Sequence, residues 1–579
     1  MIDLNLDLRR PHTQRFSVRL SLTPRQPNLS FALPRWTPGS YLLREYVGHL
    51  EGLVVRQGDR LLQPRRLTPF RWEVLVEPNA PLAIDYALQA PELTVRTCHL
   101  SAEHGFLALA AVALELDGER WSPHRLVLQL PEGWQGFVPL PQQDDGSWLA
   151  TCLDQLIDSP VEAGPHPCHR FAVAGVPHRW VSWGGDLPQQ DPDWLGDVTR
   201  VAEACCRLMG VSRPAADHYL FVLHLSEQGY GGLEHDASTV LQFGRRSLRK
   251  PEGRRRLLQL VAHEYLHQWN VRRLRPAELT PIDYSTAVVV PTLWFAEGVT
   301  SYVDQLLPHA AGCCDAEAVL SDLGNDLSRY RLARGRFVQS LQASSEEAWV
   351  KLYRPHPLAA NQQVSYYLKG AVLALVLDLH LRRHGSWLGA VLQQLWSSHG
   401  RCGRGYQQAD LLAAFAGHAP DLADLLPLWL SSTNDDLPLE DLLADVGLRL
   451  QPQHAQLPDF GWQLGSPSPG CITISSTHRD GAAQRAGLLV GDELIGLNGE
   501  RLRQPEDLLL LLGADRTDNG AAAEAEPQAH ELLLAREGRL LSVVIMPREP
   551  AVERWQLDSV PEVCADALAR RQAWLALRP

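Results

Sequence analysis

The sequence has no excess of positive charge. Its 579 residues contain 54 Lys and Arg against 67 Asp and Glu, a formal net charge of −13. Because binding to a phosphate backbone needs a basic surface, we expect no nucleic-acid partner. The first residues, MIDLNLDLRRPHTQRF, lack the apolar stretch of a signal peptide, and the sequence offers no obvious membrane-spanning run. We therefore expect neither an export signal nor a membrane partner.

Cysteine motifs are also missing. The ten cysteines are scattered, with adjacent pairs at 205–206 and 313–314 and no CxxC. This pattern is typical neither of a disulfide framework nor of a cysteine zinc site. It predicts a protein of the reducing cytoplasm.

What the sequence does contain is apolar material for several cores, with 45% hydrophobic and 21% charged residues. Residues 1–172 show short alternating segments separated by Pro, Gly and Asp, which predict an antiparallel β domain. Mainly helical periodicity follows over 173–450 and ends in a Pro-rich junction, LRLQPQHAQLPDFGW. A unit at 455–548 and a helical tail at 549–579 complete the prediction of a multidomain α+β chain.

The unit at 455–548 resembles a bacterial-type PDZ domain. A strand, GCITISS, precedes GAAQRAGLLVGDELIGLNGERL, whose order of Ala-Gly-Leu, Gly-Asp and Asn-Gly is characteristic of that family. The resemblance implies that PEDLLLLL is the helix lining a groove for a peptide or protein carboxyl terminus. The low-complexity segment that follows, GADRTDNGAAAEAEPQA, is expected to be a flexible insertion.

The segment VAHEYLHQWN carries the first chemical signal. Residues four apart lie on one face of a helix, so His263 and His267 can present two imidazoles to one ion, with Glu264 about 100° around the helix. Two zinc ligands beside a carboxylate form the HExxH arrangement of metallopeptidases. The alternative is an amphipathic helix whose histidines make core hydrogen bonds.

A third ligand is expected because catalytic zinc usually has three protein ligands and one open position. Glu297 lies in PTLWFAEGVTSYVDQLL, an apolar segment that predicts a helix ending before Pro308. A carboxylate in such surroundings is costly unless it is paired or bound to metal. Thr300 and Asp304 share roughly its face and are candidates to contact the histidines.

HExxH followed by a glutamate on a second helix resembles the gluzincin metallopeptidases. HEYLHQWNVRRLRP, LWFAEGVTSY and LPRWTPGSYLLREY (33–46) are similar specifically to the glycyl aminopeptidase family. The resemblance implies a β domain, a thermolysin-like catalytic domain at 173–450 and a PDZ domain. It also implies one zinc ion per chain, held by His263, His267 and Glu297, with Glu264 as the catalytic base.

Two further segments acquire roles from this resemblance. GYGGLEHDAST (229–239) resembles the exopeptidase segment of related aminopeptidases, whose glutamate binds the free amine of the substrate. This assigns substrate binding to Glu234 with Gly231 and Gly232, and places His235 where relatives carry Asn. Without the resemblance, the segment is a Gly-rich turn with a solvated glutamate.

VSYYLKGAVLALVLDL resembles the segment that supplies a tyrosine to the transition state, two residues before Lys-Gly. This spacing assigns the catalytic tyrosine to Tyr367, with Tyr366 as the alternative. Without the resemblance, Tyr366 and Tyr367 are explained as aromatic residues that begin a helix and pack in the core.

The resemblance implies an aminopeptidase that removes small N-terminal residues, glycine first and alanine next, from peptides with a free N-terminus. Zinc would activate a water, Glu264 would take its proton, and Tyr367 would stabilise the oxyanion. Two alternatives stay open. One is a zinc endopeptidase or processing protease guided by the PDZ groove, which has no use for an amine anchor at Glu234. The other is an inactive peptidase–PDZ scaffold.

Overall fold

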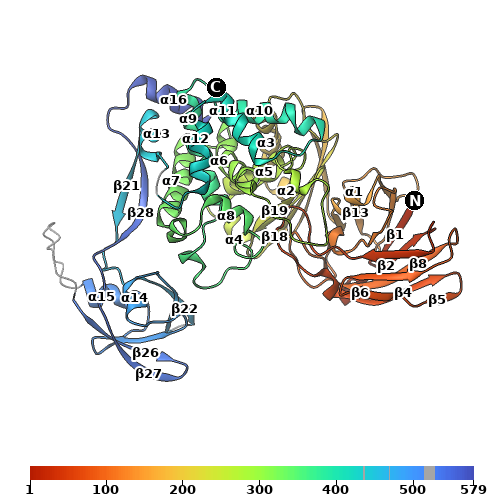
Figure 1. Ribbon diagram of the computed structural model, residues 1–579, viewed down its shortest axis with the longest axis horizontal. Helices are drawn as coiled ribbons and strands as arrows, with labels where there is room; N and C mark the ends of the chain where they lie inside the picture. Colours follow the sequence, from red (N-terminus) through yellow and green to blue (C-terminus); the bar gives the residue numbers. More distant parts are fainter. Residues whose placement is uncertain (435–436, 469, 514–527) are drawn as a thin grey trace. The chain divides into compact units, whose positions relative to one another are not determined.

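The computed structural model describes residues 1–434, 437–468, 470–513 and 528–579. The chain divides into two compact units, and Figure 1 colours it by sequence. The first unit comprises Met1–Ala316, Leu381–Ala423 and Trp574–Pro579, and the second comprises Glu317–His380 and Asp424–Ala573. The first unit thus combines three segments that are far apart in the sequence.

A seven-stranded sheet is the base of the N-terminal β region. Its strands, in spatial order, are β14 (Trp148–Ala150), β12 (His124–Gln129), β1 (Ile2–Asp7), β2 (Arg15–Leu22), β8 (Leu82–Gln89), β4 (Leu50–Gln57) and β5 (Arg60–Leu62). Buried and exposed side chains alternate along β2 because one face packs on the core. β1 and β12 run parallel, whereas the sequence predicted only antiparallel pairing.

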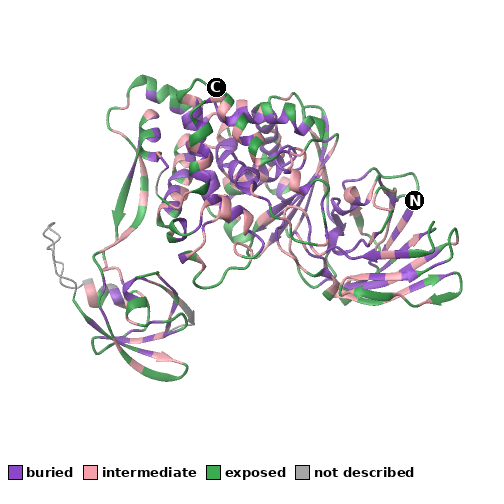
Figure 2. Ribbon diagram, viewed as in Figure 1, coloured by how far each residue is buried: buried purple, intermediate pink, exposed green. Residues whose placement is uncertain are grey.

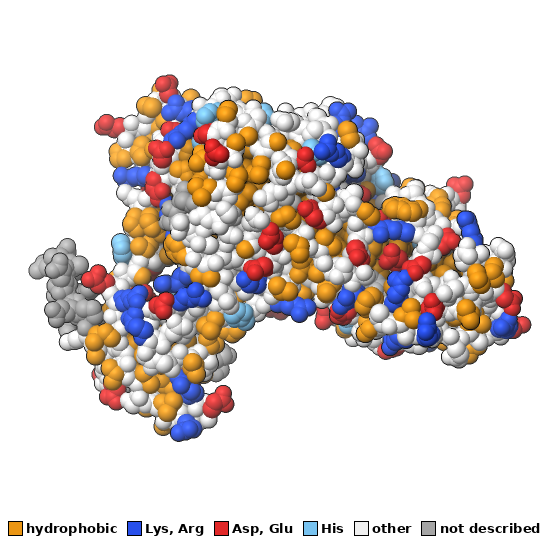
Figure 3. Space-filling view, viewed as in Figure 1, with side chains coloured by type: hydrophobic (Ala, Val, Ile, Leu, Met, Phe, Trp, Pro, Cys, Tyr) orange, Lys and Arg blue, Asp and Glu red, His pale blue; other side chains and the backbone are white. Residues whose placement is uncertain are grey.

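The solvent face of this sheet carries both signs of charge. Arg19 donates to Asp85 at 2.6 Å, and Arg15 donates to Glu51 at 2.9 Å. Blue and red side chains are interspersed over these strands in Figure 3.

Two four-stranded sheets complete the β region. One has the order β13 (Gln135–Phe137), β15 (Val161–Gly164), β10 (Gly105–Leu107) and β9 (His99–Leu100). The other has the order β11 (Glu115–Leu116), β3 (Asn28–Ala32), β7 (Arg71–Leu75) and β6 (Arg65–Thr68). A short helix, α1 (Leu153–Ile157), precedes β15.

A five-stranded sheet follows where the sequence predicted mainly helices. Its order is β16 (Cys168–Val173), β17 (Val176–Trp183), β18 (Tyr219–Ser226), β20 (Ser238–Gly244) and β19 (Tyr230–Glu234). β17, β18 and β20 are parallel, and β19 is the antiparallel edge strand. Nearly every residue of β18 is buried, and such a strand shows no apolar–polar alternation that could reveal it in the sequence.

Helices pack beside this sheet in the first unit. They are α2 (Leu187–Gln190), α3 (Trp194–Leu208), α4 (Arg245–Leu248), α5 (Gly253–Leu266), the π-helix Trp294–Val299, α6 (Thr300–Ala310), α10 (Leu388–Ser398) and α11 (Gln408–His418). α5 and α6 are largely buried (Figure 2). The prediction that the second helix ends before Pro308 is wrong, because α6 continues past it. Pro308 is buried near the end of the helix, where its missing N–H removes only one hydrogen bond to the preceding turn.

The second unit contributes α7 (Ala316–Leu332), α8 (Leu341–Glu346), α13 (Leu439–Asp445) and most of α9 (Tyr366–Arg383), α12 (Leu422–Ser431) and α16 (Ala565–Leu575). The segment Ala359–Arg383 is long and apolar enough to span a membrane, but 83% of its most apolar window is buried, which is typical of a core helix. The predicted Pro-rich junction forms a strand, β21 (Leu448–His454). It pairs with β28 (Val552–Ser559) of the predicted helical tail.

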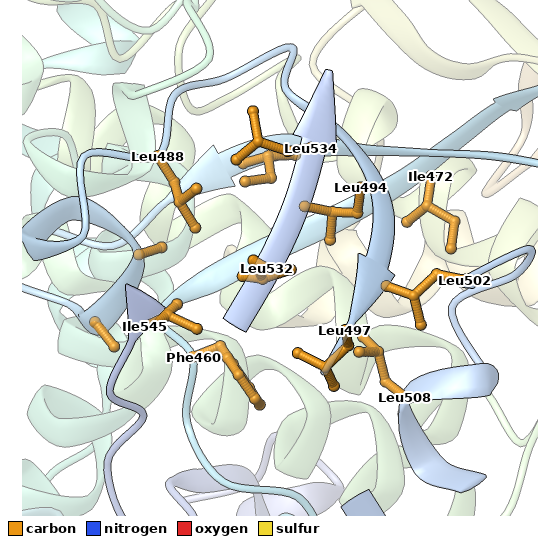
Figure 4. Close-up of a cluster of buried hydrophobic side chains, with 13 residues drawn as sticks. Phe460, Ile472, Leu488, Leu494, Leu497, Leu502, Leu508, Leu532, Leu534 and Ile545 are labelled. Atoms are coloured by element: carbon orange, nitrogen blue, oxygen red, sulfur yellow. The ribbon is translucent and has the colours of Figure 1, made fainter. Parts of the chain in front are cut away.

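Between β21 and β28 lies a six-stranded sheet. Its strands are β22 (Trp462–Ser468), β23 (Cys471–Thr477), β24 (Glu493–Leu497), β25 (Glu500–Arg501), β26 (His530–Arg536) and β27 (Arg539–Ile545). Ile472, Leu494 and Leu534 meet in its core (Figure 4). Two short helices, α14 (Ala482–Arg485) and α15 (Asp507–Gly513), belong to this region. The low-complexity segment lies mostly outside the described residues.

Candidate metal centre

Three predicted ligands come together in the first unit. His263 lies in the last turn of α5 and His267 follows directly after it, and their ring centroids are 4.7 Å apart. Their Nε2 atoms lie 3.6 and 3.3 Å from Oε2 of Glu297. Ligands about 2.0 to 2.1 Å from a tetrahedral zinc ion are about 3.3 Å from one another. The spacing of this open cluster, as we name these three residues, therefore fits an ion at its centre.

The outer nitrogens of both imidazoles are held by the protein. Nδ1 of His263 donates to Asp304 at 2.7 Å, and Nδ1 of His267 donates to the carbonyl of Asn270 at 2.5 Å. These bonds orient the two imidazoles so that each Nε2 points toward Glu297. Thr300 does not contact the histidines but lies 3.3 Å from the side-chain amide of Asn270.

The carboxylate of Glu297 is fixed by a local irregularity of the helix. Residues Trp294–Val299 form a π-helix, so the helix that carries Glu297 is wider here than an α-helix. Glu297 is 2% exposed. Burial by itself raises its pKa, but His267 and His263 outweigh this effect and lower the pKa to about 2. Single-turn π-helices frequently occur at functional sites, yet apolar periodicity gave no sign of this one.

Glu264 faces the same space from α5. A side chain at Gly232 of β19 would overlap its carboxyl group, so the strand backbone passes directly beside it. Burial raises the pKa of Glu264 to about 7 against the opposing effects of His263 and His267. Its Oε2 is buried without a hydrogen-bond partner among the described residues. The group is therefore suited to exchange a proton near neutral pH.

Glu234 brings a second carboxylate to this space. It ends β19, an edge strand, and does not lie in the turn that the sequence suggested. Its side chain, that of Glu264 and a nitrogen of His267 offer atoms within 4.8 Å of one another. Oε1 of Glu234 is also buried without a partner in the described part of the chain. Two adjacent buried carboxylates of this kind favour a cationic ligand.

Gly231 borders open space, whereas His235 takes part in a buried hydrogen-bond network. Gly231 has a φ of 151°, and a Cβ there would meet open space, so its role beside a substrate stays a prediction. His235 turns away into a network in which its Nδ1 donates to Asp158 at 3.0 Å. The same carboxylate is 2.7 Å from the guanidinium of Arg272. The sequence gave no sign of Asp158, which follows α1 in the β region.

Tyr366 and Tyr367 begin α9 in the second unit. Tyr366 is fully buried, whereas Tyr367 is partly exposed. The hydroxyl of Tyr353 lies 3.3 Å from that of Tyr366 and 3.1 Å from that of Tyr367. The role of Tyr367 at the oxyanion stays a prediction.

A second group of histidines surrounds a carboxylate elsewhere in the first unit. Nδ1 of His104 and Nε2 of His166 donate to Oε1 of Glu162 at 3.0 and 2.9 Å. Nε2 of His224 donates to Oε2 at 2.8 Å. We name these four buried residues the bonded cluster, because their separations are those of direct hydrogen bonds.

Two stretches of the chain match known protein families. Residues 256–373 match the family model of the M61 glycyl aminopeptidases, and residues 3–165 match that of the peptidase M61 N-terminal domain. The chain carries domains of the peptidase M61 family. These M61 domains support a hydrolase of the peptidase class.

Two solved structures were compared with the chain. The crystal structure of an aminopeptidase N family protein from Idiomarina loihiensis has a TM-score of 0.90 and 26% identity, covering 99% of this chain and 100% of that one. Legionella pneumophila aminopeptidase A in complex with aspartic acid has a TM-score of 0.48 and 12% identity, covering 97% of this chain and 57% of that one. No curated protein matches the chain significantly.

Proposed function

We propose that the protein is a zinc-dependent aminopeptidase that removes small N-terminal residues, glycine first and alanine next, from peptides. The observation that carries this proposal is the position of Glu234. Its buried carboxylate lies next to Glu264 and His267 and has an oxygen without a partner in the described chain. A free amine lies about 2.5 Å from the carbonyl carbon of its own residue. An anchor this close to the open cluster therefore suits cleavage after the first residue.

The residues divide the chemistry between them. His263, His267 and Glu297 would hold one zinc ion, which supplies a Lewis acid to polarise the attacking water and the scissile carbonyl. Glu264 takes a proton from the water and returns it to the leaving amine. Glu234 binds the ammonium of the substrate, and Tyr367 donates its hydroxyl proton in a hydrogen bond to the oxyanion.

We further propose that the β22–β27 sheet with α15 is a PDZ domain that binds a peptide or protein carboxyl terminus. Its support is the motif order in the sequence and the helix found at PEDLLLLL, on which Leu510 is 69% exposed. A cytoplasmic location is also proposed, because all ten cysteines are free thiols.

The decisive experiment compares glycyl peptides with free and acetylated amines, with and without a chelator. We expect acetylation to lower kcat/KM at least about tenfold, and the chelator to abolish cleavage of both kinds of peptide. Glu234→Ala should keep zinc and lower kcat/KM on free glycyl peptides at least about tenfold. Equal cleavage of both peptides would favour the endopeptidase instead. Retained activity in Glu264→Gln would place the catalytic base elsewhere.

The choice of tyrosine is tested by two matched variants. Tyr367→Phe should lower kcat by about 10² to 10³ with little change in KM, because an oxyanion donor acts in the transition state. Tyr366→Phe should not, since Tyr366 is fully buried. The reverse result would exchange their roles.

A further inference from the structure

The N-terminal β region reaches the amine anchor through one tight turn. Thr37-Pro38-Gly39-Ser40 lies in the loop after β3, within the segment LPRWTPGSYLLREY. The backbone N–H of Ser40 donates to the carbonyl of Thr37 at 3.1 Å, and Gly39 has a φ of 83°. Proline at the second position and a positive φ at the third are the features of a type II turn. Glycine at position 39 is therefore required by the turn itself.

The turn is held firmly. The fully buried indole of Trp36 donates to the carbonyl of Asp283 at 2.8 Å, and the backbone N–H of Arg35 donates to the carbonyl of Tyr284 at 2.9 Å. Thr37 and Ser40 are themselves buried. A turn fixed at these points holds whatever packs against it in one position.

What packs against it is the carboxylate of Glu234. A Cβ on Gly39 would lie 2.6 Å from both carboxylate oxygens and 2.7 Å from Cδ1 of Leu233. The bare backbone of Gly39 therefore covers one side of the carboxylate. The carboxylate also offers an oxygen within 4.8 Å of an oxygen of Glu264 and a nitrogen of His267. A substrate ammonium would bind where these groups converge.

A second contact fixes the strand that bears the anchor. Nη2 of Arg96, also from the β region, donates to the carbonyl of Gly232 at 3.1 Å. β19 has no neighbouring strand on its outer side among the described residues. The Arg96 bond and the turn hold this edge strand from the β region.

We propose that Gly39 is a positioning residue for the amine anchor and that the β region is thereby part of the peptide-binding site. The proposal rests on the aminopeptidase function proposed above. Gly39 acts through Glu234: it holds the carboxylate at the distance from the open cluster at which a free N-terminus, and no interior peptide bond, is bound.

Gly39→Ala tests this proposal against a matched control. The added methyl meets the carboxylate, so kcat/KM on free glycyl peptides should fall at least about tenfold, mainly through KM. The variant's residual kcat/KM on acetylated peptides should stay within about twofold of the wild-type value. The ratio of kcat/KM on free to acetylated peptides, which measures the preference for a free amine, should therefore fall. Gly118→Ala is the control: its φ is 79°, and a Cβ there meets nothing within 4 Å. It should bring similar backbone strain and leave the preference unchanged.

A double-mutant cycle separates positioning from support of the fold. In a Glu234→Ala background, Gly39→Ala should change kcat/KM less than about twofold. An equal loss in both backgrounds, or on both kinds of peptide, would overturn the proposal. If Gly39→Ala does not fold, adding Leu233→Ala and Glu234→Asp should restore folding, since both side chains that the methyl meets are then shorter. Failure to restore it also counts against the contact.

The two hypotheses fail in different ways. A wild type that cleaves free and acetylated peptides equally overturns the aminopeptidase function and this inference with it. If the wild type prefers free over acetylated peptides and Gly39→Ala shows the same preference, this inference alone is overturned.

Discussion

The open and bonded clusters use the same side chains in opposite ways. Both place histidines around a buried glutamate in the first unit. In the open cluster the nitrogen–oxygen separations are 3.3 and 3.6 Å, whereas in the bonded cluster they are 2.8 to 3.0 Å. The longer separations of the open cluster leave room for an ion between the carboxylate and the imidazoles, whereas those of the bonded cluster fit direct hydrogen bonds.

The surroundings of the two clusters differ as well. Asp304 and the Asn270 carbonyl fix the outer nitrogens of the open cluster. In the bonded cluster, Nε2 of His104 and Nδ1 of His224 have no hydrogen-bond partner among the described residues. Metal-binding histidines almost always have such a partner. The bonded cluster is therefore better explained as a polar link between β15 and β18 than as a second metal site.

The largest effect on metal content and activity should come from replacing the glutamate of each cluster by glutamine, one cluster at a time. Glu297→Gln should lose the metal and with it nearly all peptidase activity, because one of three ligands is removed. Glu162→Gln should keep one zinc per chain and its activity. Metal analysis of the purified variants checks this. Two zinc ions in the wild type and one in Glu162→Gln would break the distinction between the clusters.

Glu264→Gln sharpens the comparison within the open cluster itself. The amide cannot accept the proton of the attacking water, so kcat should fall by about 10² to 10⁴. Zinc content should not change, because Glu264 is not among the three ligands. A simultaneous loss of zinc would show that Glu264 is a ligand and not the base.

The bonded cluster should matter for stability. Glu162→Gln leaves buried imidazoles without their full acceptor, and each unsatisfied donor costs about 1 to 3 kcal/mol. Urea unfolding should therefore show a clear loss of stability. Asp85→Asn is the control, since its exposed pair with Arg19 should contribute about 0 to 1 kcal/mol. Equal losses in the two variants would contradict the role assigned to Glu162.

The smallest effect concerns pH. Burial raises the pKa of Glu162, but His224 and the hydrogen bonds from His104 and His166 outweigh it and hold the pKa below its usual range. A carboxyl group whose pKa is lowered by folding stabilises the fold above its unfolded pKa. The stability difference between wild type and Glu162→Gln should therefore narrow only below about pH 4.3. A stability difference that instead widens as the pH falls through 6 would assign the effect to protonation of the histidines, because the Glu162 carboxylate favours their charged form.

The sequence was most informative where one helix carried the signal. The spacing of His263 and His267 placed both on one face, and the apolar setting of Glu297 pointed to a cation. It was least informative for contacts between distant segments. Nothing near Gly39 in the sequence indicates that its turn meets Glu234, and the buried strand β18 has no periodicity that separates it from a helix.

The return of the last residues of the chain to the first unit also has a consequence for how the protein is made. Trp574 donates to the hydroxyl of Tyr302 on α6 at 2.6 Å, and both belong to the first unit. Between Ala316 and Trp574 lie about 260 residues, which at about 5 to 20 residues per second take roughly 13 to 50 s to synthesise. A nascent chain therefore carries every residue of the open cluster well before α6 gains this contact. The first unit can therefore be completed only after residues 574–579 have been translated.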